Sequence, residues 1–228
     1  MYTVIIPAAG AGTRMKLGYN KLFHKIAQRT IIEHTVDCFL KDAKCAQIII
    51  TTSIHDQLKM NNLFNKCPHI EIILGGETRQ ESILNALDHV REKTVLVHDG
   101  ARPFVNARII KACYEAALTG AGAVACVPVK DTIKQRHPIK KDTIATTLIR
   151  DQLILIQTPQ AFPTDVLRQA NAYAKNAGTL NEATDDASLV EKYTAVEIKI
   201  VDGDYKNIKF TTSEDIAYFE FLMKKERM

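Results

Sequence analysis

Positively charged side chains follow the first apolar run of the sequence. The stretch "IIPAAGAGTRMKLGYNKLF", residues 5–23, passes from apolar residues into alanines and glycines and then carries Arg14, Lys16 and Lys21. The backbone N–H groups of small residues can cradle an anion, and an arginine can bind two of its oxygens. We therefore interpret Arg14 and Lys21 as partners of a phosphate-bearing ligand, and Lys16, which has no further support, as a solvated charge.

Two common phosphate-binding motifs do not fit this loop. Gly10 and Gly12 begin a G-x-G pattern, but the third glycine of the dinucleotide fingerprint would fall at Met15. The P-loop motif G-x-x-x-x-G-K-[ST] does not occur either. Because a lone G-x-G is also typical of an ordinary tight turn, it is the neighbouring cations that favour anion binding.

Two further loops combine small residues with charge after an apolar run. "GGETR" follows residues 70–74, and "HDGARP" extends from the run at 94–98. Asp99 in the second loop is a typical Mg²⁺ ligand beside nucleotide phosphates, with a helix cap or an ion pair to Arg102 as the alternative. We interpret His98 as a buried supporting residue. Because ligands bind beyond the carboxyl ends of strands in open parallel sheets, three such loops predict one shared site.

Apolar periodicity indicates the elements that position these loops. Continuous apolar runs predict buried strands at 2–7, 46–51, 70–74, 94–98 and 123–129, and an alternating run predicts one at 196–201. Helical spacing predicts helices at 30–41, 55–64, 78–91, 107–118, 164–176, 186–192 and 212–225. Thr30 and Glu33 fit a capping box, and Asp185-Asp186 fits a helix cap. We expect a single α/β domain over residues 1–228, with a Rossmann-like, mostly parallel sheet flanked by helices.

The alternation breaks at residues 130–150. The stretch "KDTIKQRHPIKKDTIATTLIR" has two short β-like runs around His137-Pro138 and is too polar for a central strand. We expect a protruding β-hairpin arm. Because an isolated hairpin is marginally stable in water, we also expect the arm to pack on a second copy and form a homodimer.

Composition and charge argue against several classes of protein. The net charge is +4 with the basic residues scattered, so nucleic acid is not the expected ligand. No apolar run reaches the roughly 18 residues of a membrane span, and no secretory signal peptide is expected. The 5 cysteines have no C-x-x-C spacing and indicate reduced thiols in a cytoplasmic protein. A small anionic substrate agrees with this composition.

Lys209 lies in a strand-like stretch between Ile208 and Phe210. A lysine in this setting either extends along an edge into solvent or points into a site. The residues alone leave both interpretations open.

The motifs, taken in order, resemble one enzyme family. "PAAGAGTRM", the lysine seven residues after Arg14, "GGETRQES", "VLVHDGARPF", "VKDTIK", "QTPQAF", "TDDASLVE" and "NIKFTT" extend over nearly the whole chain. Together they are similar to the 2-C-methyl-D-erythritol 4-phosphate cytidylyltransferases of the non-mevalonate isoprenoid pathway. The resemblance implies that CTP and a polyol phosphate react, with Mg²⁺, to give a CDP-alcohol and pyrophosphate.

Three alternatives stand beside this interpretation. Ribitol-5-phosphate cytidylyltransferases perform the same chemistry, but they usually open with "LAGG" and lack a close match to "TDDASLVE". A non-catalytic nucleotide-binding module would not need all of the cations described above. A glycosyltransferase would normally offer a D-x-D metal pair, whereas "HDG" supplies one acid.

The resemblance also implies functions for individual residues. It implies that the catalytic cations are Arg14, Lys21, Arg150 and Lys209. It implies that the nucleotide is lined by the residues Pro7, Ala8, Ala9, Gly10, Gly12, Gly76, Glu77, Ser82, Asp99 and Gly100. It also implies that Asp99 serves the metal. It implies that Arg102, Thr132 and Thr158 contact the acceptor substrate. It further implies that Arg150 and Thr132 enter the active site of the partner chain. Two departures from the family pattern are Glu77, where many relatives have aspartate, and "YNKLF" in place of the commoner "PKQ".

Overall fold

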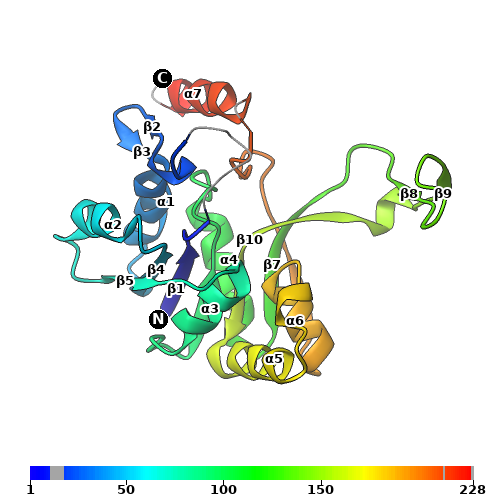
Figure 1. Ribbon diagram of the computed structural model, residues 1–228, viewed down its shortest axis with the longest axis horizontal. Coiled ribbons are helices and arrows are strands. Elements are labelled where there is room, and N and C mark those ends of the chain that lie inside the picture. Colours follow the sequence, from blue (N-terminus) through cyan, green and yellow to red (C-terminus); the bar gives the residue numbers. More distant parts are fainter. Residues whose placement is uncertain (11–17, 213, 227–228) are drawn as a thin grey trace.

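A seven-stranded sheet runs through the residues that the computed structural model describes, namely 1–10, 18–212 and 214–226 (Figure 1). The strand order is β11-β7-β10-β6-β1-β4-β5. The strands are β1 (Tyr2–Pro7), β4 (Cys45–Thr52), β5 (Ile70–Leu74), β6 (Thr94–Val97), β7 (Gly122–Pro128), β10 (Ile154–Pro163) and β11 (Ile198–Asp202). β1 pairs in parallel with β4 and β6, β4 with β5, and β7 with β11. The predicted mostly parallel α/β sheet is confirmed.

The sequence analysis did not predict β10, which runs antiparallel between β6 and β7. Its middle carries Gln157, Thr158, Pro159 and Gln160, and polar residues with a proline are atypical of a central strand. The pairing with β7 shifts register between Ile156 and Gln160, which accommodates this segment. The chain therefore returns from the arm into the middle of the sheet, and this part of the sheet is mixed.

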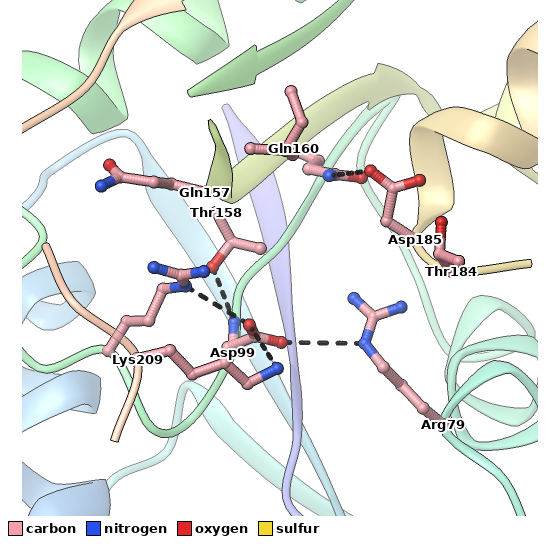
Figure 2. A pocket seen from close by; sticks show the side chains of 10 residues that line it. Arg79, Asp99, Gln157, Thr158, Gln160, Thr184, Asp185 and Lys209 are labelled. Carbon is pink, nitrogen blue, oxygen red and sulfur yellow. Dashed lines mark hydrogen bonds and ion pairs between the residues drawn. The ribbon is translucent and has the colours of Figure 1, made fainter. Parts of the chain in front are cut away.

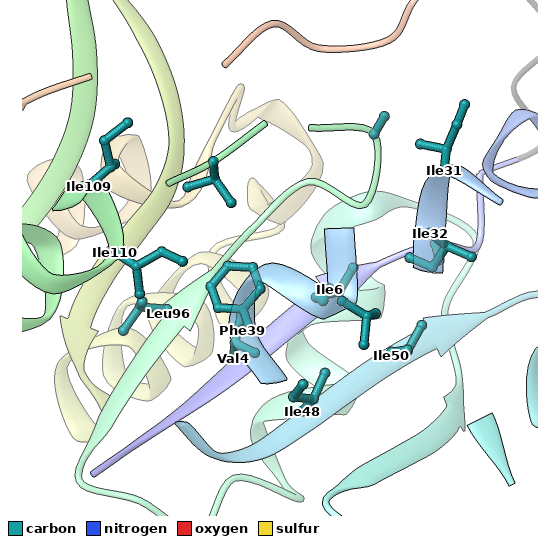
Figure 3. Packing of buried hydrophobic residues seen from close by; sticks show 14 of the residues in the cluster. Val4, Ile6, Ile31, Ile32, Phe39, Ile48, Ile50, Leu96, Ile109 and Ile110 are labelled. Atoms are coloured by element: carbon teal, nitrogen blue, oxygen red, sulfur yellow. The ribbon is translucent and has the colours of Figure 1, made fainter. Parts of the chain in front are cut away.

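Helices cover both faces of the sheet. One face carries α1 (Ile31–Leu40), α2 (Gln57–Phe64), α4 (Ala107–Leu118) and α7 (Glu214–Glu226), and the other carries α3 (Arg79–Leu87), α5 (Thr164–Asn176) and α6 (Asp186–Tyr193). Val4 and Ile6 of β1 face the first group, and Ile5 faces the second. In Figure 3, Phe39 of α1 lies close to Val4 of the sheet. Because each such side chain stabilises the fold by about 1.5–3 kcal/mol when buried, the sheet is a firm base for the loops at its edge.

Both predicted helix caps are present. The Thr30 hydroxyl accepts the N–H of Glu33, and the Glu33 carboxylate accepts the N–H of Thr30, which makes a capping box at α1. Asp185 Oδ1 accepts the N–H of Ser188 at 3.0 Å and begins α6. The described residues also form a hairpin, β2 (Lys25–Ile26) with β3 (Arg29–Thr30), and the 3₁₀ turns η2 (Lys21–Phe23), η3 (Arg150–Gln152) and η4 (Leu180–Glu182).

The predicted protruding hairpin is also present. β8 (Lys134–Arg136) and β9 (Ile144–Thr147) pair antiparallel in a sheet of their own, and the hairpin extends away from the body of the molecule (Figure 1). Every residue of both strands is exposed. None of the helices in the described part of the chain is long and apolar enough to cross a membrane.

Candidate active site

Asp99 is the centre of a charge cluster just beyond the carboxyl end of β6 (Figure 2). Lys209 Nζ lies 3.0 Å and Arg102 Nε 3.4 Å from Asp99 Oδ2, and Arg79 Nε lies 3.7 Å from Oδ1. Burial raises the pKa of the Asp99 carboxyl, but Lys209, Arg79 and Arg102 outweigh it and hold that pKa well below the ordinary range of aspartate. Asp99 is therefore ionised, and its charge is exceeded by those of Lys209 and Arg102, which leaves positive charge that favours an anion.

A buried hydrogen-bond relay fixes the backbone of Asp99. The N–H of Asp99 donates to Thr158 Oγ1 at 3.0 Å, and Thr158 Oγ1 lies 3.1 Å from His98 Nδ1. His98 Nε2 lies 3.0 Å from the carbonyl oxygen of Arg102. Because a carbonyl only accepts, Nε2 carries the proton and Nδ1 accepts from the Thr158 hydroxyl. Burial lowers the pKa of His98 to about 4, so the ring is neutral.

Arg79 is a site residue that the sequence analysis missed, although it closes the quoted loop "GGETR". Its Nη2 lies 2.7 Å from Asp186 Oδ2, and its Nη1 donates to Gln80 Oε1 at 2.8 Å. Asp186 is wholly buried, and this burial raises its pKa while Arg79 lowers it. Arg79 thus bridges Asp99 and Asp186. The signal in the sequence was an arginine three residues after the glycine pair that follows β5.

Asp185 and Asp186 are held by β10. Gln160 Oε1 accepts the N–H of Asp186 at 3.1 Å and that of Ala187 at 2.9 Å. Gln160 Nε2 donates to Asp185 Oδ2 at 2.7 Å, a contact drawn in Figure 2. The sequence analysis assigned both aspartates to a cap, whereas the structure gives the cap to Asp185 and an ion pair to Asp186.

The charge cluster lines a cavity of about 310 Å³, a size suited to a small ligand. Its lining contains four of the predicted site residues, Asp99, Arg102, Thr158 and Lys209. The lining residues that were not predicted are Arg79, Ile156, Gln157, Gln160, Thr184 and Asp185. Most of these lie on β10 and just before α6, so the missed strand also accounts for much of the missed lining.

Lys21 joins the same region from the loop after β1. Its Nζ donates to the backbone carbonyl of Phe210, the residue after Lys209. The structure thereby brings Lys21 to the segment that carries Lys209, which lies far away in the sequence. Gly10 is exposed, whereas Gly12 and Arg14 lie outside the described residues.

The loops after β1 and β5 meet at Gly75. A Cβ atom on Gly75 would lie 2.6 Å from Ser82 Oγ and 2.8 Å from Ala9 Cβ, so only glycine allows this approach. Ser82 Oγ accepts the N–H of Gly76 at 3.0 Å, and Glu81 Oε2 accepts the N–H of Glu77 at 2.9 Å. The segment that contains Gly76, Glu77 and Ser82, predicted at the cytidine end, therefore adjoins the loop after β1. The N–H groups of Gly76 and Glu77 are already hydrogen-bonded to side chains of the protein.

Three other predicted nucleotide residues pack mainly inward. Pro7 is half-buried at the end of β1 and pairs with Thr51. Ala8 is buried and donates its N–H to the Thr51 carbonyl at 2.8 Å. A Cβ on Gly100 would lie 3.2 Å from core side chains, and the Gly100 carbonyl accepts the Thr35 hydroxyl at 2.8 Å. Their contacts with the nucleotide stay predictions.

Thr132 and Arg150 do not lie among the residues that line the described cavity. Both are exposed at the base of the arm, where Arg150 Nη1 donates to the Lys130 carbonyl at 3.4 Å. Their predicted contact with substrate stays a prediction.

The described residues contain no group of three or more His, Cys, Asp or Glu side chains that could hold a metal by itself. Mg²⁺ commonly uses one or two carboxylates together with substrate phosphates and water. Asp99 offers one ionised carboxylate, but its two oxygens already contact Lys209, Arg102 and Arg79, so phosphate oxygens and water would have to supply most of the metal's ligands.

Parallel strands ending in glycine-containing loops, with a cationic cavity beyond their carboxyl ends, define a nucleotide-binding α/β protein of the nucleotidyltransferase type. The model of the family "IspD: 2-C-methyl-D-erythritol 4-phosphate cytidylyltransferase" matches residues 2–225. The chain belongs to this family, which confirms the resemblance noted in the sequence.

Individual proteins similar to this chain carry the name of the same family. The 2-C-methyl-D-erythritol 4-phosphate cytidylyltransferase of Bacillus velezensis is 42% identical over 99% of this chain and 97% of that protein. The enzyme of the same name from Bacillus cytotoxicus is 42% identical over 100% of both. Among solved structures, that enzyme from Thermus thermophilus has a TM-score of 0.81 and 32% identity, covering 97% of this chain and 98% of that chain. The 4-diphosphocytidyl-2C-methyl-D-erythritol synthase of Anaerococcus prevotii has a TM-score of 0.85 and 28% identity, covering 98% and 96%.

Proposed function

We propose that this chain transfers the cytidylyl group of CTP to 2-C-methyl-D-erythritol 4-phosphate and releases pyrophosphate. Membership of the family and the identity to named relatives support this reaction. Within the structure, the observation that carries it is the convergence of Lys209, Arg102 and Arg79 on Asp99 in one cavity. Such a surplus of positive charge suits a reaction between two phosphate-bearing substrates.

The chemistry requires positioning rather than a strong base. A phosphate oxygen of the acceptor attacks the α-phosphorus of CTP, and the bond to the β-phosphate breaks as pyrophosphate leaves with the electron pair. A phosphate monoester is already largely ionised at neutral pH, so no proton has to be removed. The site agrees, because His98 is buried and both of its ring nitrogens are engaged. Catalysis then depends on in-line placement and on cations aimed at the transition state.

We assign the described residues to the two substrates as follows. Lys209 and Arg102 are proposed to bind the acceptor phosphate, with Asp99 fixing their positions through its carboxylate. Lys21 contacts the backbone carbonyl of Phe210, the residue after Lys209, and is proposed to stabilise charge on the α-phosphate. Thr158 is proposed to act through Asp99, because its hydroxyl accepts the Asp99 N–H.

Mg²⁺ is proposed as the cofactor, with Asp99 and oxygens of the triphosphate as its ligands. When bound, it would neutralise phosphate charge and ease the departure of pyrophosphate.

A homodimer through the 130–150 arm is also proposed. The arm exposes large apolar side chains, with Ile139 84%, Ile144 63% and Ile149 64% accessible. A second copy would cover them, and Arg150 and Thr132 would then reach the partner's cavity. We also propose that residues 1–228 form a single domain, which the continuous seven-stranded sheet supports. A cytoplasmic location is proposed because all 5 cysteines are free thiols.

The test measures pyrophosphate release from CTP with methylerythritol phosphate, ribitol 5-phosphate or ribulose 5-phosphate, with the product identified by mass spectrometry. We expect turnover with the first acceptor and a large loss for Lys209→Ala. The exposed neighbour Lys206→Ala is the matched control and should behave as wild type. Preference for ribitol 5-phosphate would favour the second family. CTP binding without release with any acceptor would favour a non-catalytic module.

A further inference from the structure

The side chain of Asn20 ties the backbone just before Lys21 to three parts of the fold. Asn20 is only 5% exposed. Its Oδ1 accepts the N–H of Leu22 at 3.1 Å and caps the turn η2, in which Lys21 is the first residue. Its Nδ2 donates to the Ala8 carbonyl at 3.0 Å and to Asp56 Oδ2 at 3.0 Å. Both donor hydrogens and the acceptor oxygen of this buried amide are therefore used, which leaves the turn little freedom to shift.

Asp56 contributes to this anchor instead of capping its own helix. It occupies the N-cap position of α2, where aspartate is favoured because its carboxylate accepts N–H groups of the first helical turn. No such bond is present. Its Oδ2 instead accepts from Asn20 and, at 3.1 Å, from the Ser53 hydroxyl. The Asp56 carboxylate therefore binds Asn20, the residue before Lys21, and not the first turn of α2. We infer that this hydrogen bond stabilises the turn η2 more than the helix α2.

A second contact from α2 holds the other side of the same turn. Lys59 Nζ lies 4.0 Å from the centre of the Phe23 ring and 5.9 Å from that of Tyr19. A cation over an aromatic face is attracted by the negative charge of that face. The start of α2 therefore contacts residues on both sides of Lys21.

We propose that Asn20 and Asp56 are a positioning pair that sets where the Lys21 ammonium can act during cytidylyl transfer. The inference rests on the proposed function, because it concerns the same reaction. Lys21 reaches the Phe210 carbonyl through a flexible side chain of four methylene groups. A shift of its backbone is passed on to the ammonium, and a displacement of about 1 Å in a reacting geometry can cost on the order of 100-fold in rate. Neither member of the pair touches substrate; both act through Lys21.

The test exchanges the partners of the Asn20–Asp56 bond. Asn20→Asp keeps the cap on Leu22 but sets a carboxylate against Asp56 and the Ala8 carbonyl. Asp56→Asn keeps an uncharged acceptor for Asn20. The double variant lets the new amide at 56 donate to the new carboxylate at 20. For CTP and methylerythritol phosphate, we expect Asn20→Asp to lower kcat by about 10- to 100-fold with less than about a threefold change in the KM for CTP. The double variant should regain at least about fivefold in kcat over Asn20→Asp.

The controls separate positioning from folding. Asn62→Asp makes the same charge change at an exposed position of α2 and should leave kcat unchanged. If Asn20→Asp does not fold, Asp56→Ala carries the test, because it spares the cap on Leu22 and the bond to Ala8; a kcat loss of about fivefold is then expected.

Two failures are distinguishable. A wild-type protein that releases no pyrophosphate with any acceptor refutes the proposed function. A wild-type protein that turns over, with folded variants that keep kcat, change only KM or show no recovery in the double variant, refutes the positioning pair.

Discussion

At the scale of single residues, the charge on Asp99 organises the cavity. One carboxylate holds Lys209 and Arg102 on one oxygen and Arg79 on the other, and Arg79 is shared with the buried Asp186. These groups are mutually dependent, because removing a partner from a buried ion pair leaves an uncompensated charge. Changing one of them should therefore disturb the positions of the others.

Asp99→Asn is expected to lower turnover severely at low Mg²⁺ and to recover in part at high Mg²⁺. The amide cannot balance the three cations, and it is a weaker ligand for the proposed metal. The measurement is kcat as a function of Mg²⁺ concentration, with the exposed Asp165→Asn as the control. A loss that is the same at every Mg²⁺ concentration would place Asp99 outside the metal's surroundings and leave it only the ion pairs.

Lys21→Ala is expected to lower kcat far more than it raises the KM for CTP. Its charge should matter most in the transition state, and removing one such preorganised donor typically costs on the order of 10²–10³ in rate. Steady-state kinetics with varied CTP would test this, with exposed Lys25→Ala as a matched control. A change confined to KM would assign Lys21 to ground-state binding.

At the scale of the elements, the site depends on how β10 meets β6. Thr158 on β10 accepts the Asp99 N–H and contacts His98, which follows β6 directly. Gln160, further along β10, holds the N-terminus of α6 and with it Asp186. The antiparallel strand thus joins the Asp99 loop to the Arg79–Asp186 pair.

The neutral state of His98 predicts a pH dependence of stability. Its folded pKa of about 4 lies below the ordinary value of 6.5. As pH falls, the unfolded chain takes up the proton first, so the full stability is present above about pH 6.5 and is lost progressively down to about pH 4. The loss should approach about 3 kcal/mol in the free energy of unfolding.

Urea unfolding of wild type and His98→Gln between pH 7 and pH 4 isolates this contribution as the difference between the two curves. Replacing the exposed His55 with Gln provides the surface control. Parallel curves for wild type and His98→Gln would mean that His98 is not held neutral by the fold.

At the scale of the whole molecule, the arm extends away from the body that contains the cavity (Figure 1). β8 and β9 are exposed throughout, and Thr132 and Arg150 at the base of the arm lie apart from the cavity lining of their own chain. The proposed dimer would give each site Lys21 from one chain and Arg150 from the other.

Mixing two inactive variants tests this arrangement. Lys21→Ala and Arg150→Ala homodimers should each be nearly inactive. After the two are unfolded, mixed equally and refolded, about half of the dimers are mixed by random pairing. One site of each mixed dimer then carries both changes and the other carries none, so activity should return to about a quarter of wild type. If mass spectrometry shows mixed dimers but no activity returns, the shared site is wrong.

Much of the fold was predictable from local pattern. The apolar runs that became β1, β4, β5, β6 and β7 were readable because strands buried on both faces are apolar throughout. The capping box at α1 was readable because both of its halves lie within four residues. Three small-residue loops predicted a site at the strand ends. Arg79 and Asp99, from the segments after β5 and β6, line the cavity, whereas the described residues of the loop after β1 are not in its lining.

The rest was decided by tertiary structure. β10 escaped prediction because its polar residues find their partners in neighbouring strands and in α6, not in its own periodicity. Arg79 meets a partner 107 residues away, and Lys21 meets one 189 residues away. Local sequence therefore determined most of the elements, the loops and the kinds of charge, because these depend on residues a few positions apart. Which charges meet was determined only by the packed sheet, because that depends on how distant segments lie side by side.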